Sequence, residues 1–150
     1  MSRRSQIEMT PAEVAEFLDQ QRIVICATSG PHGWPHLMPL WYVVRDQDIW
    51  AWTYAKSQKV RNLERDPRAT LQVEDGELYH ELRGVMIEAH TTIHHDLETV
   101  AGIGSELLTR FAGGGGADHI VRAQAAKRVG LQFTADRIAS WDHRKLGAAY

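Results

Sequence analysis

The sequence has few of the features that would restrict it to a special class of protein. It contains one cysteine, Cys26, among 150 residues, so no disulfide can form within the chain. Its 17 Lys and Arg do not outnumber its 19 Asp and Glu, which disfavours a general nucleic-acid binder. The longest apolar run, Leu37–Val44, is too short to cross a membrane, and the first residues lack the apolar stretch of a signal peptide. The expected location is a reducing cytoplasm, away from the membrane.

Motifs of several enzyme classes are also absent. There is no nucleophile elbow, Walker loop or dinucleotide fingerprint, and the glycine run at 113–116 lacks the following Lys-Ser/Thr of a phosphate loop. His90 and His94 share one face of an expected strand, but such neighbours diverge and no cysteine joins them. We therefore expect no metal site. Cys26 lies in an apolar run, so we expect a small core residue rather than a nucleophile.

The composition is that of an ordinary globular domain. Hydrophobic residues make up 43% of the chain and charged residues 24%. A domain of this size buries about 70% of the surface that its unfolded chain exposes, so its core needs no crosslink. Because no linker or repeat divides the chain, we expect one domain over residues 1–150, with residues 1–9 flexible.

Periodicity and turn residues predict an antiparallel sheet with several helices. Expected helices cover 10–20, 57–66, 96–111 and 117–126, expected strands cover 22–28, 36–45, 49–54, 69–74, 78–94, 128–134 and 138–141, and the glycine run 113–116 is expected to be a flexible loop. Thr10, Pro11 and Glu13 form a capping-box start for the first helix. Pro39 lacks an N–H group, so its strand is expected at an edge or a bulge. Hairpin-joined strands favour a mainly β, α+β fold: a closed or partly closed barrel with helices outside.

The segment after the third expected strand carries the clearest chemical signal. A helix begins near Ser57, where free backbone N–H groups and the helix dipole favour an anion. The same turn carries Lys56, Lys59 and Arg61, and Asn62 shares a helix face with Lys59. Converging cations and hydrogen-bond donors of this kind are what a phosphate group requires. The solvated basic start of a surface helix is the alternative interpretation.

Aromatic residues gather around the same strand. Trp50, Trp52 and Tyr54 alternate and so share a face, while Trp34 and Trp41 lie on the preceding turn and strand. A flat aromatic cofactor could lie beside them. A tryptophan-rich core or a dimer interface would produce the same pattern.

Four pieces of sequence occur in a characteristic order. They are Gly33-Trp34-Pro35-His36 leading into Pro39-Leu40-Trp41, Lys56-Ser57-Gln58-Lys59-Val60-Arg61-Asn62-Leu63, Arg65-Asp66-Pro67-Arg68-Ala69, and Gly84-Val85. Together they resemble the pyridoxamine 5'-phosphate oxidase-like superfamily of split-barrel proteins that bind flavins or deazaflavins. The resemblance extends from Thr10 to Trp141, and the Ser-x-Lys-x-x-Asn run before Asp-Pro-Arg is its most specific part.

The resemblance implies a homodimer of antiparallel split β-barrels, each of about six to seven strands with peripheral helices, and cofactor sites at the dimer interface. It implies that Ser57, Lys59 and Asn62 lie beside the cofactor phosphate. The ring would be bordered by Met38, Pro39, Leu40, Trp41, Trp52, Thr53 and Tyr54. A basic groove for an anionic tail would draw on Lys56, Arg61, Arg68, Arg128 and the residues near Lys145.

The function that the resemblance favours is hydride transfer from reduced coenzyme F420, a deazaflavin, to a conjugated small-molecule substrate. The alternatives are an FMN-dependent oxidoreductase of the same fold, a non-catalytic flavin or haem carrier, and a non-catalytic interaction domain. Oxidation of vitamin B6 is not expected, because the substrate arginines and longer terminal parts of those oxidases have no counterpart here. No catalytic side chain is assigned, and the proton donor is left open among Tyr54, His36 and solvent.

Overall fold

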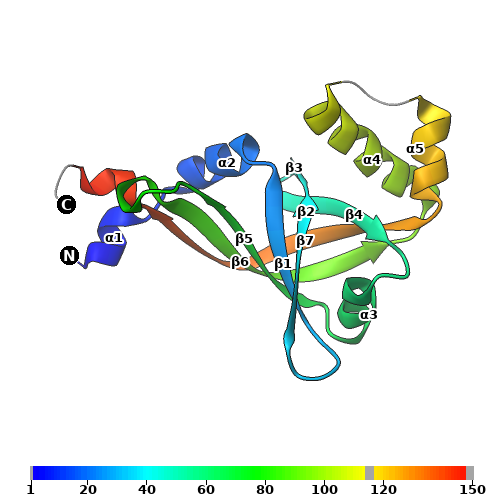
Figure 1. The fold of residues 1–150 in the computed structure, drawn as a ribbon, viewed down its shortest axis with the longest axis horizontal. Coiled ribbons are helices and arrows are strands. Elements are labelled where there is room, and N and C mark those ends of the chain that lie inside the picture. The colour runs from blue at the N-terminus through cyan, green and yellow to red at the C-terminus, as the bar shows by residue number, and fades with distance from the viewer. Residues whose placement is uncertain (1, 114–116, 148–150) are drawn as a thin grey trace.

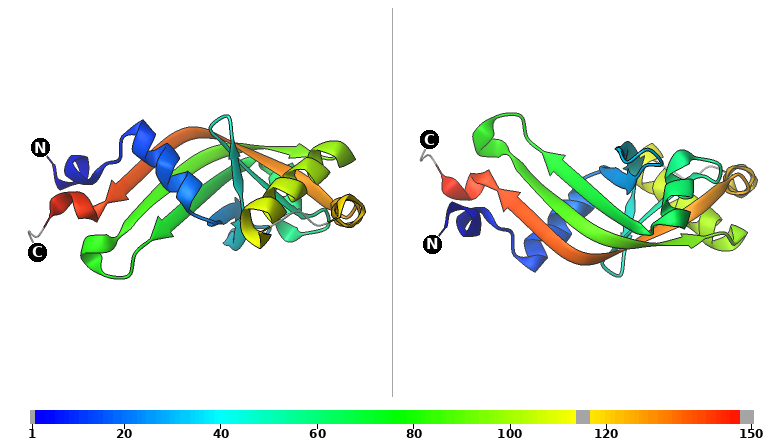
Figure 2. Two further views of the ribbon diagram at one scale, coloured as in Figure 1. Left: turned by 90° about the horizontal axis from the view of Figure 1, so that it is seen from above. Right: turned by 90° about the horizontal axis from the view of Figure 1, so that it is seen from below.

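The computed structural model of the protein describes residues 2–113 and 117–147 (Figure 1). Seven antiparallel strands form one sheet in the order β2-β1-β5-β6-β7-β4-β3. The sheet curls, and helices lie at both of its ends (Figure 2). This mixed α+β and mainly β architecture confirms the expected split barrel of six to seven strands with peripheral helices.

The element bounds follow the sequence pattern closely. The strands are β1 Ile23–Ser29, β2 Pro35–Trp41, β3 Val43–Arg45, β4 Asp48–Tyr54, β5 Arg68–Asp75, β6 Arg83–His94 and β7 Arg128–Asp142. The α-helices are α1 Arg3–Ile7, α2 Pro11–Gln20, α3 Gln58–Arg65, α4 Leu97–Ala112 and α5 Asp118–Ala125, and the short 3₁₀ helices are η1 Tyr79–Glu81 and η2 His143–Leu146. Within the described ranges no helix has both the length and the apolar character that a membrane span needs.

The main hydrophobic core lies on the inner face of the curled sheet. Buried side chains such as Leu71 of β5 and Leu131 of β7 meet there. Helix α2 covers part of this face with Phe17, and α3 covers another part with Val60 and Leu63. The core therefore fixes the position of α3 relative to β1 and β4.

Helices α4 and α5 pack on the outer face of the sheet, next to β4 (Figure 1). Their apolar sides enclose Trp52, which lies against Val100 and Ile103. Gly104 permits this close approach, because a Cβ atom at that position would lie 2.3 Å from the Trp52 ring carbon Cζ3. One face of the aromatic strand is thus occupied by protein.

The strand expected over 36–45 is interrupted. Tyr42 separates β2 from β3, because its side chain turns into the core and its hydroxyl donates to the Leu18 carbonyl at 2.5 Å. Strand β2 forms one edge of the sheet, which confirms the edge position predicted from Pro39.

Two further expectations are corrected at the other strands. The separate strands expected at 128–134 and 138–141 are one continuous strand, β7, which carries a β-bulge where Asp136 is left between Ala135 and Arg137. Residues 79–81 form η1, so β6 begins only at Arg83. The expected glycine loop lies mainly at 114–116, outside the described residues, while Gly113 caps α4 with φ of 73°.

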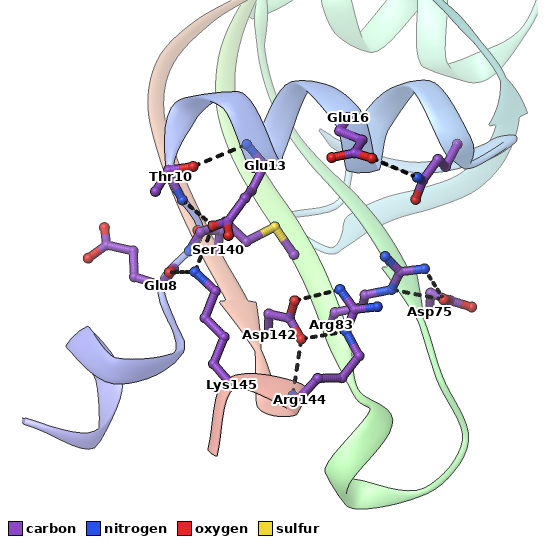
Figure 3. Close-up of polar contacts among 12 residues, drawn as sticks. Glu8, Thr10, Glu13, Glu16, Asp75, Arg83, Ser140, Asp142, Arg144 and Lys145 are labelled. Carbon is purple, nitrogen blue, oxygen red and sulfur yellow. Dashed lines mark hydrogen bonds and ion pairs between the residues drawn. The ribbon is translucent and has the colours of Figure 1, made fainter. Parts of the chain in front are cut away.

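The N-terminal and C-terminal segments meet at one end of the sheet (Figures 1 and 3). Lys145 Nζ donates to the Glu8 carbonyl at 2.8 Å and to Glu13 Oε2 at 2.6 Å. The buried carboxylate of Asp142 accepts three hydrogen bonds from Arg144, two of them from the guanidinium. Residues 3–7 form α1, and the flexibility expected of residues 1–9 stays a prediction.

Candidate functional site

The start of α3 is the one sequence-predicted site whose backbone is arranged for an anion. Strand β4 ends at Tyr54, whose carbonyl accepts from the Ser57 N–H at 3.0 Å, and α3 begins at Gln58. The first N–H groups of an α-helix have no acceptor within the helix. Ser57 occupies the N-cap position, yet its buried Oγ atom has no hydrogen-bond partner among the described residues. The first backbone N–H groups of α3 therefore have no side-chain cap, and the first turn contains no acidic residue.

Cations surround this helix start. Lys56 and Arg61 are exposed and neither forms an ion pair with a described carboxylate. Strand pairing adds two more cations, since the Ala55 N–H donates to the Lys127 carbonyl at 3.0 Å and Tyr54 pairs with Arg128. Lys127 was missed by sequence reasoning, because only the pairing of β4 with β7 brings it here.

Arg128 also organises the neighbouring aromatic side chains. Its guanidinium carbon lies 4.7 Å from the ring centre of Trp52 and 4.2 Å from that of Tyr54. Its Nη1 donates to the Gln124 carbonyl at 3.0 Å. Cation–π contacts of this kind are worth about 0.5–1 kcal/mol each when exposed, so Arg128 holds Tyr54 beside the helix start.

Lys59 and Asn62 lie beneath the helix, facing the interior of the barrel. Lys59 is 7% exposed, and its Nζ donates to Thr53 Oγ1 at 2.9 Å, the only hydrogen bond of that ammonium among the described residues. Asn62 is fully buried and donates to Thr28 Oγ1 at 3.0 Å. The amide oxygen of Asn62 accepts from Gln58 Nε2 at 2.8 Å. Asn62 is committed to protein partners, whereas Lys59 keeps unused donors.

Burial changes the acid–base properties of this interior cluster. Desolvation lowers the pKa of Lys59, and the nearby Cys26 thiol acts in the opposite direction. Desolvation also raises the pKa of Cys26 to about 12, against the opposing effect of Lys59. A thiol with so high a pKa is not a thiolate at neutral pH, so Cys26 has the properties of a core residue.

The two segments expected to border a ring are residues 38–41 of β2 and residues 52–54 of β4, and their side chains do not all point the same way. Edge strand β2, which carries residues 38–41, comes close to β4 although the two are not neighbours in the sheet. Thr53 faces the interior with Lys59, whereas Trp52 is turned outward against α4 and Tyr54 is 58% exposed on the same outer face. Trp41 lies 5.2 Å from Phe111 of α4, measured between ring centres.

Three cations expected to form a tail groove lie at different places. Arg68 is paired with Asp66 at 2.9 Å beyond the C-terminal end of α3, and this pairing lowers the pKa of Asp66 to about 2. Lys145 lies at the end of the sheet that carries the termini, where Glu8 and Glu13 bind its ammonium (Figure 3). The single chain therefore gathers Arg128 at the start of α3 but neither Arg68 nor Lys145.

The histidines do not assemble into a metal centre. Across the described ranges, no group of three or more His, Cys, Asp or Glu side chains is placed to hold a metal ion. His94 stacks on Trp50 with ring centres 4.9 Å apart, and its Nε2 contacts Gln132 Oε1 at 2.9 Å. His90 is paired through Nδ1 with Asp136 at the bulge of β7.

Comparison with known proteins is consistent with this fold. A family model described as pyridoxamine 5'-phosphate oxidase matches residues 10–142. No match was found among curated proteins. A crystal structure of the conserved hypothetical protein Rv2991 from Mycobacterium tuberculosis is 41% identical, with a TM-score of 0.91, and the similarity covers 100% of this chain and 95% of that one.

Two more distant structures share the fold. An F420 reductase is 20% identical, with a TM-score of 0.69, and the similarity covers 87% of this chain and 98% of that one. A FAD-binding protein from Mesorhizobium loti is 17% identical, with a TM-score of 0.69, and the similarity covers 89% of this chain and 94% of that one. At these identities the likeness concerns the fold alone.

Proposed function

Because the chain belongs to the pyridoxamine 5'-phosphate oxidase family, we propose that it is an oxidoreductase that binds coenzyme F420 and reduces a conjugated small molecule. In this proposal the phosphate of the coenzyme lies at the start of α3. A homodimer that encloses the coenzyme between two subunits completes the site, and FMN in place of F420 is the alternative.

The unpartnered hydroxyl of Ser57 is the observation that carries the proposal. Leaving a buried polar group without a partner costs about 1–3 kcal/mol, and an anion that accepts its hydrogen bond removes that cost. The free N–H groups of the first helical turn and the helix dipole favour the same ligand. The unused donors of Lys59 lie on the interior side of this turn. The residues present therefore fit a phosphate group.

The number of cations favours F420 over FMN. Lys56, Arg61, Lys127 and Arg128 gather at this end of the sheet, and no described carboxylate forms an ion pair with any of them. FMN carries one phosphate, whereas F420 carries a phosphodiester followed by the carboxylates of an oligoglutamate tail. A ligand with several separated negative groups can interact with several separated cations at once, whereas a single phosphate cannot.

The protein's part in the reaction is to bind, orient and shield. When bound, the reduced deazaflavin supplies the hydride. Arg128 holds Tyr54 in place, and the exposed side chains of Met38 and Trp41 on β2 are available to border a ring. No nucleophilic side chain is required, which agrees with the high pKa of Cys26. Exclusion of water would come from the second subunit.

Calorimetric titration of F420 and of FMN tests the binding step. Removal of a charged hydrogen bond to phosphate costs about 1.5–3 kcal/mol, so Lys56→Ala and Ser57→Ala should weaken F420 binding about 10- to 100-fold. Arg4→Ala removes the same charge as Lys56→Ala from α1, at the opposite end of the molecule, and should leave the affinity unchanged (Figure 1).

The same titrations separate the competing functions. Tighter binding of FMN than of F420 would favour the FMN-dependent oxidoreductase. Tight F420 binding without turnover of reduced F420 by enones, quinones or tetrapyrroles would favour a carrier. Affinities that Lys56→Ala and Ser57→Ala leave unchanged would place the ligand elsewhere and contradict the proposal.

A further inference from the structure

A groove lies on the outer face of the sheet, near the C-terminal end of α3 rather than its start. It has a volume of about 740 Å³ and extends from the β1–β2 loop across β1, β5 and β6 to the bulge of β7. Small side chains, including Ala27 of β1 and Thr70 of β5, make its floor. Drug-sized ligands occupy pockets of about 300–1,000 Å³, so the groove is large enough for one.

The wall of the groove is an aromatic side chain held by a tight turn. Trp34 is 80% exposed and lies in the β1–β2 loop, which projects from the sheet (Figure 1). The Gly30 N–H donates to the Trp34 carbonyl at 3.1 Å, and a Cβ atom on Gly30 would lie 2.3 Å from that oxygen. Gly33 adopts φ of 80°, which side-chain-bearing residues rarely adopt. The backbone of the turn thus fixes the position of the Trp34 main chain, from which the indole extends.

The opposite wall carries polar groups that the β-bulge brings to the groove. The extra residue of the bulge, Asp136, pairs with His90 on the adjacent strand, and both line the groove. Glu88 lies beside them and pairs with Arg137 at 2.8 Å. Bulges re-aim side chains and are frequent next to binding sites. Hydrogen-bonding side chains, small residues and Trp34 therefore line the same groove.

The groove offers little free positive charge. Glu88 is offset by Arg137, and Arg68, the one Arg or Lys among the described lining residues, is already paired with Asp66. A strongly anionic ligand would meet no free cation here among the described residues, unlike at the start of α3. The chemistry of the groove suits an uncharged flat ring with polar atoms at its edge.

We infer that this groove binds a planar, uncharged, conjugated molecule, which stacks on Trp34 and directs its polar edge toward His90 and Asp136. This ligand site is separate from the proposed coenzyme site, because none of the residues proposed to border the ring lines the groove. Ser29 lines the groove, and its carbonyl accepts from Nη2 of Arg65, the last residue of α3, at 2.5 Å. The C-terminal end of α3 thus adjoins the groove, whereas the proposed anion site is at the other end of the same helix.

Titration with menadione, a neutral naphthoquinone, tests the inference on the full chain without coenzyme. The indole N–H signals of the five tryptophans are followed by ¹H–¹⁵N NMR, and each is assigned by a single substitution. Menadione should shift the Trp34 signal saturably and leave those of Trp50 and Trp52 unmoved. Loss of an aromatic stacking contact corresponds to an affinity loss of roughly two- to tenfold in Trp34→Leu.

Two further variants complete the test. Ala27→Leu fills the floor without changing charge or the Trp34 turn, and it should abolish the saturable shift. Tyr79→Leu removes an exposed aromatic ring outside the groove and should bind menadione as the unmodified chain does. Absence of a saturable Trp34 shift, or a shift that Ala27→Leu leaves intact, would overturn the inference.

Competition separates this inference from the proposed function. If F420 or FMN alone shifts Trp34 and displaces menadione, the groove holds the coenzyme ring and the inference is wrong. If menadione binds as expected while Lys56→Ala and Ser57→Ala bind F420 normally, the inference about the groove is supported and the proposed coenzyme site at the start of α3 is wrong.

Discussion

Two glycines of α4 give a sharp test of how the outer helices pack. Replacement of glycine by alanine inside a helix favours folding by about 1 kcal/mol when the new methyl group has room. At Gly102 the nearest atom to an added Cβ is Arg45 Nη2 at 3.8 Å, an ordinary contact. At Gly104 the Cβ would lie 2.3 Å from Cζ3 and 2.6 Å from Cη2 of Trp52. Arg128 covers the same indole at 4.7 Å, so the ring cannot retreat freely.

The two substitutions should therefore have opposite signs. Overpacking of a well-filled core costs about 1–3 kcal/mol, which at Gly104 outweighs the gain in helix propensity. We expect Gly102→Ala to raise the free energy of unfolding by about 0.5–1 kcal/mol and Gly104→Ala to lower it by about 1–2 kcal/mol. Urea denaturation followed by circular dichroism measures both. Equal effects of the two alanines would refute the close packing of α4 on Trp52.

Three further predictions concern buried polar groups. Hydrogen bonds from Arg144 hold the pKa of Asp142 below its ordinary value, so its stabilisation is present above a pH of about 4 and is lost as the pH falls through the folded-state pKa. Asp142→Asn should cost about 1–3 kcal/mol at pH 7 in urea denaturation and reduce the stability difference between pH 7 and pH 3; an unchanged difference would contradict this. Burial raises the pKa of Cys26 to about 12, so iodoacetamide at pH 8 should label it only after unfolding, and labelling of the folded protein at the rate of a free thiol would count against the buried position. Tyr42→Phe removes the hydrogen bond to Leu18 and should lower the free energy of unfolding by about 0.5–1.5 kcal/mol, whereas a more stable variant would show that this bond contributes nothing.

The fold was predictable where local rules act. The capping box of Thr10 and Glu13 forms as expected, with the Glu13 N–H donating to Thr10 Oγ1 at 3.2 Å. The placement of Pro39 at an edge follows from its missing N–H group. The break at Tyr42 was not predictable, because its cause is a hydrogen bond to a residue 24 positions away. The continuity of β7 was also not predictable, because the bulge at Asp136 interrupts the alternation of inward and outward side chains along the strand.

The start of α3 was predictable from the sequence, but the orientation of the helix was not. Residue types and helix start placed Lys56, Ser57 and Arg61 together from the sequence alone. The 3.6-residue helical period identified the shared face of Lys59 and Asn62, but it could not show that this face is the buried one. That depends on which side of α3 meets β1 and β4. The phosphate contacts implied for Lys59 and Asn62 stay a prediction.

The backbone amides that open α3 give the most direct test of the anion site. We predict that F420, added to ¹⁵N-labelled protein, shifts the N–H signals of Gln58, Lys59 and Val60 more than those of other helix starts, because these donors have no acceptor within α3. If those three signals stay in place while F420 saturates the protein, the coenzyme binds elsewhere and the account of this site is wrong.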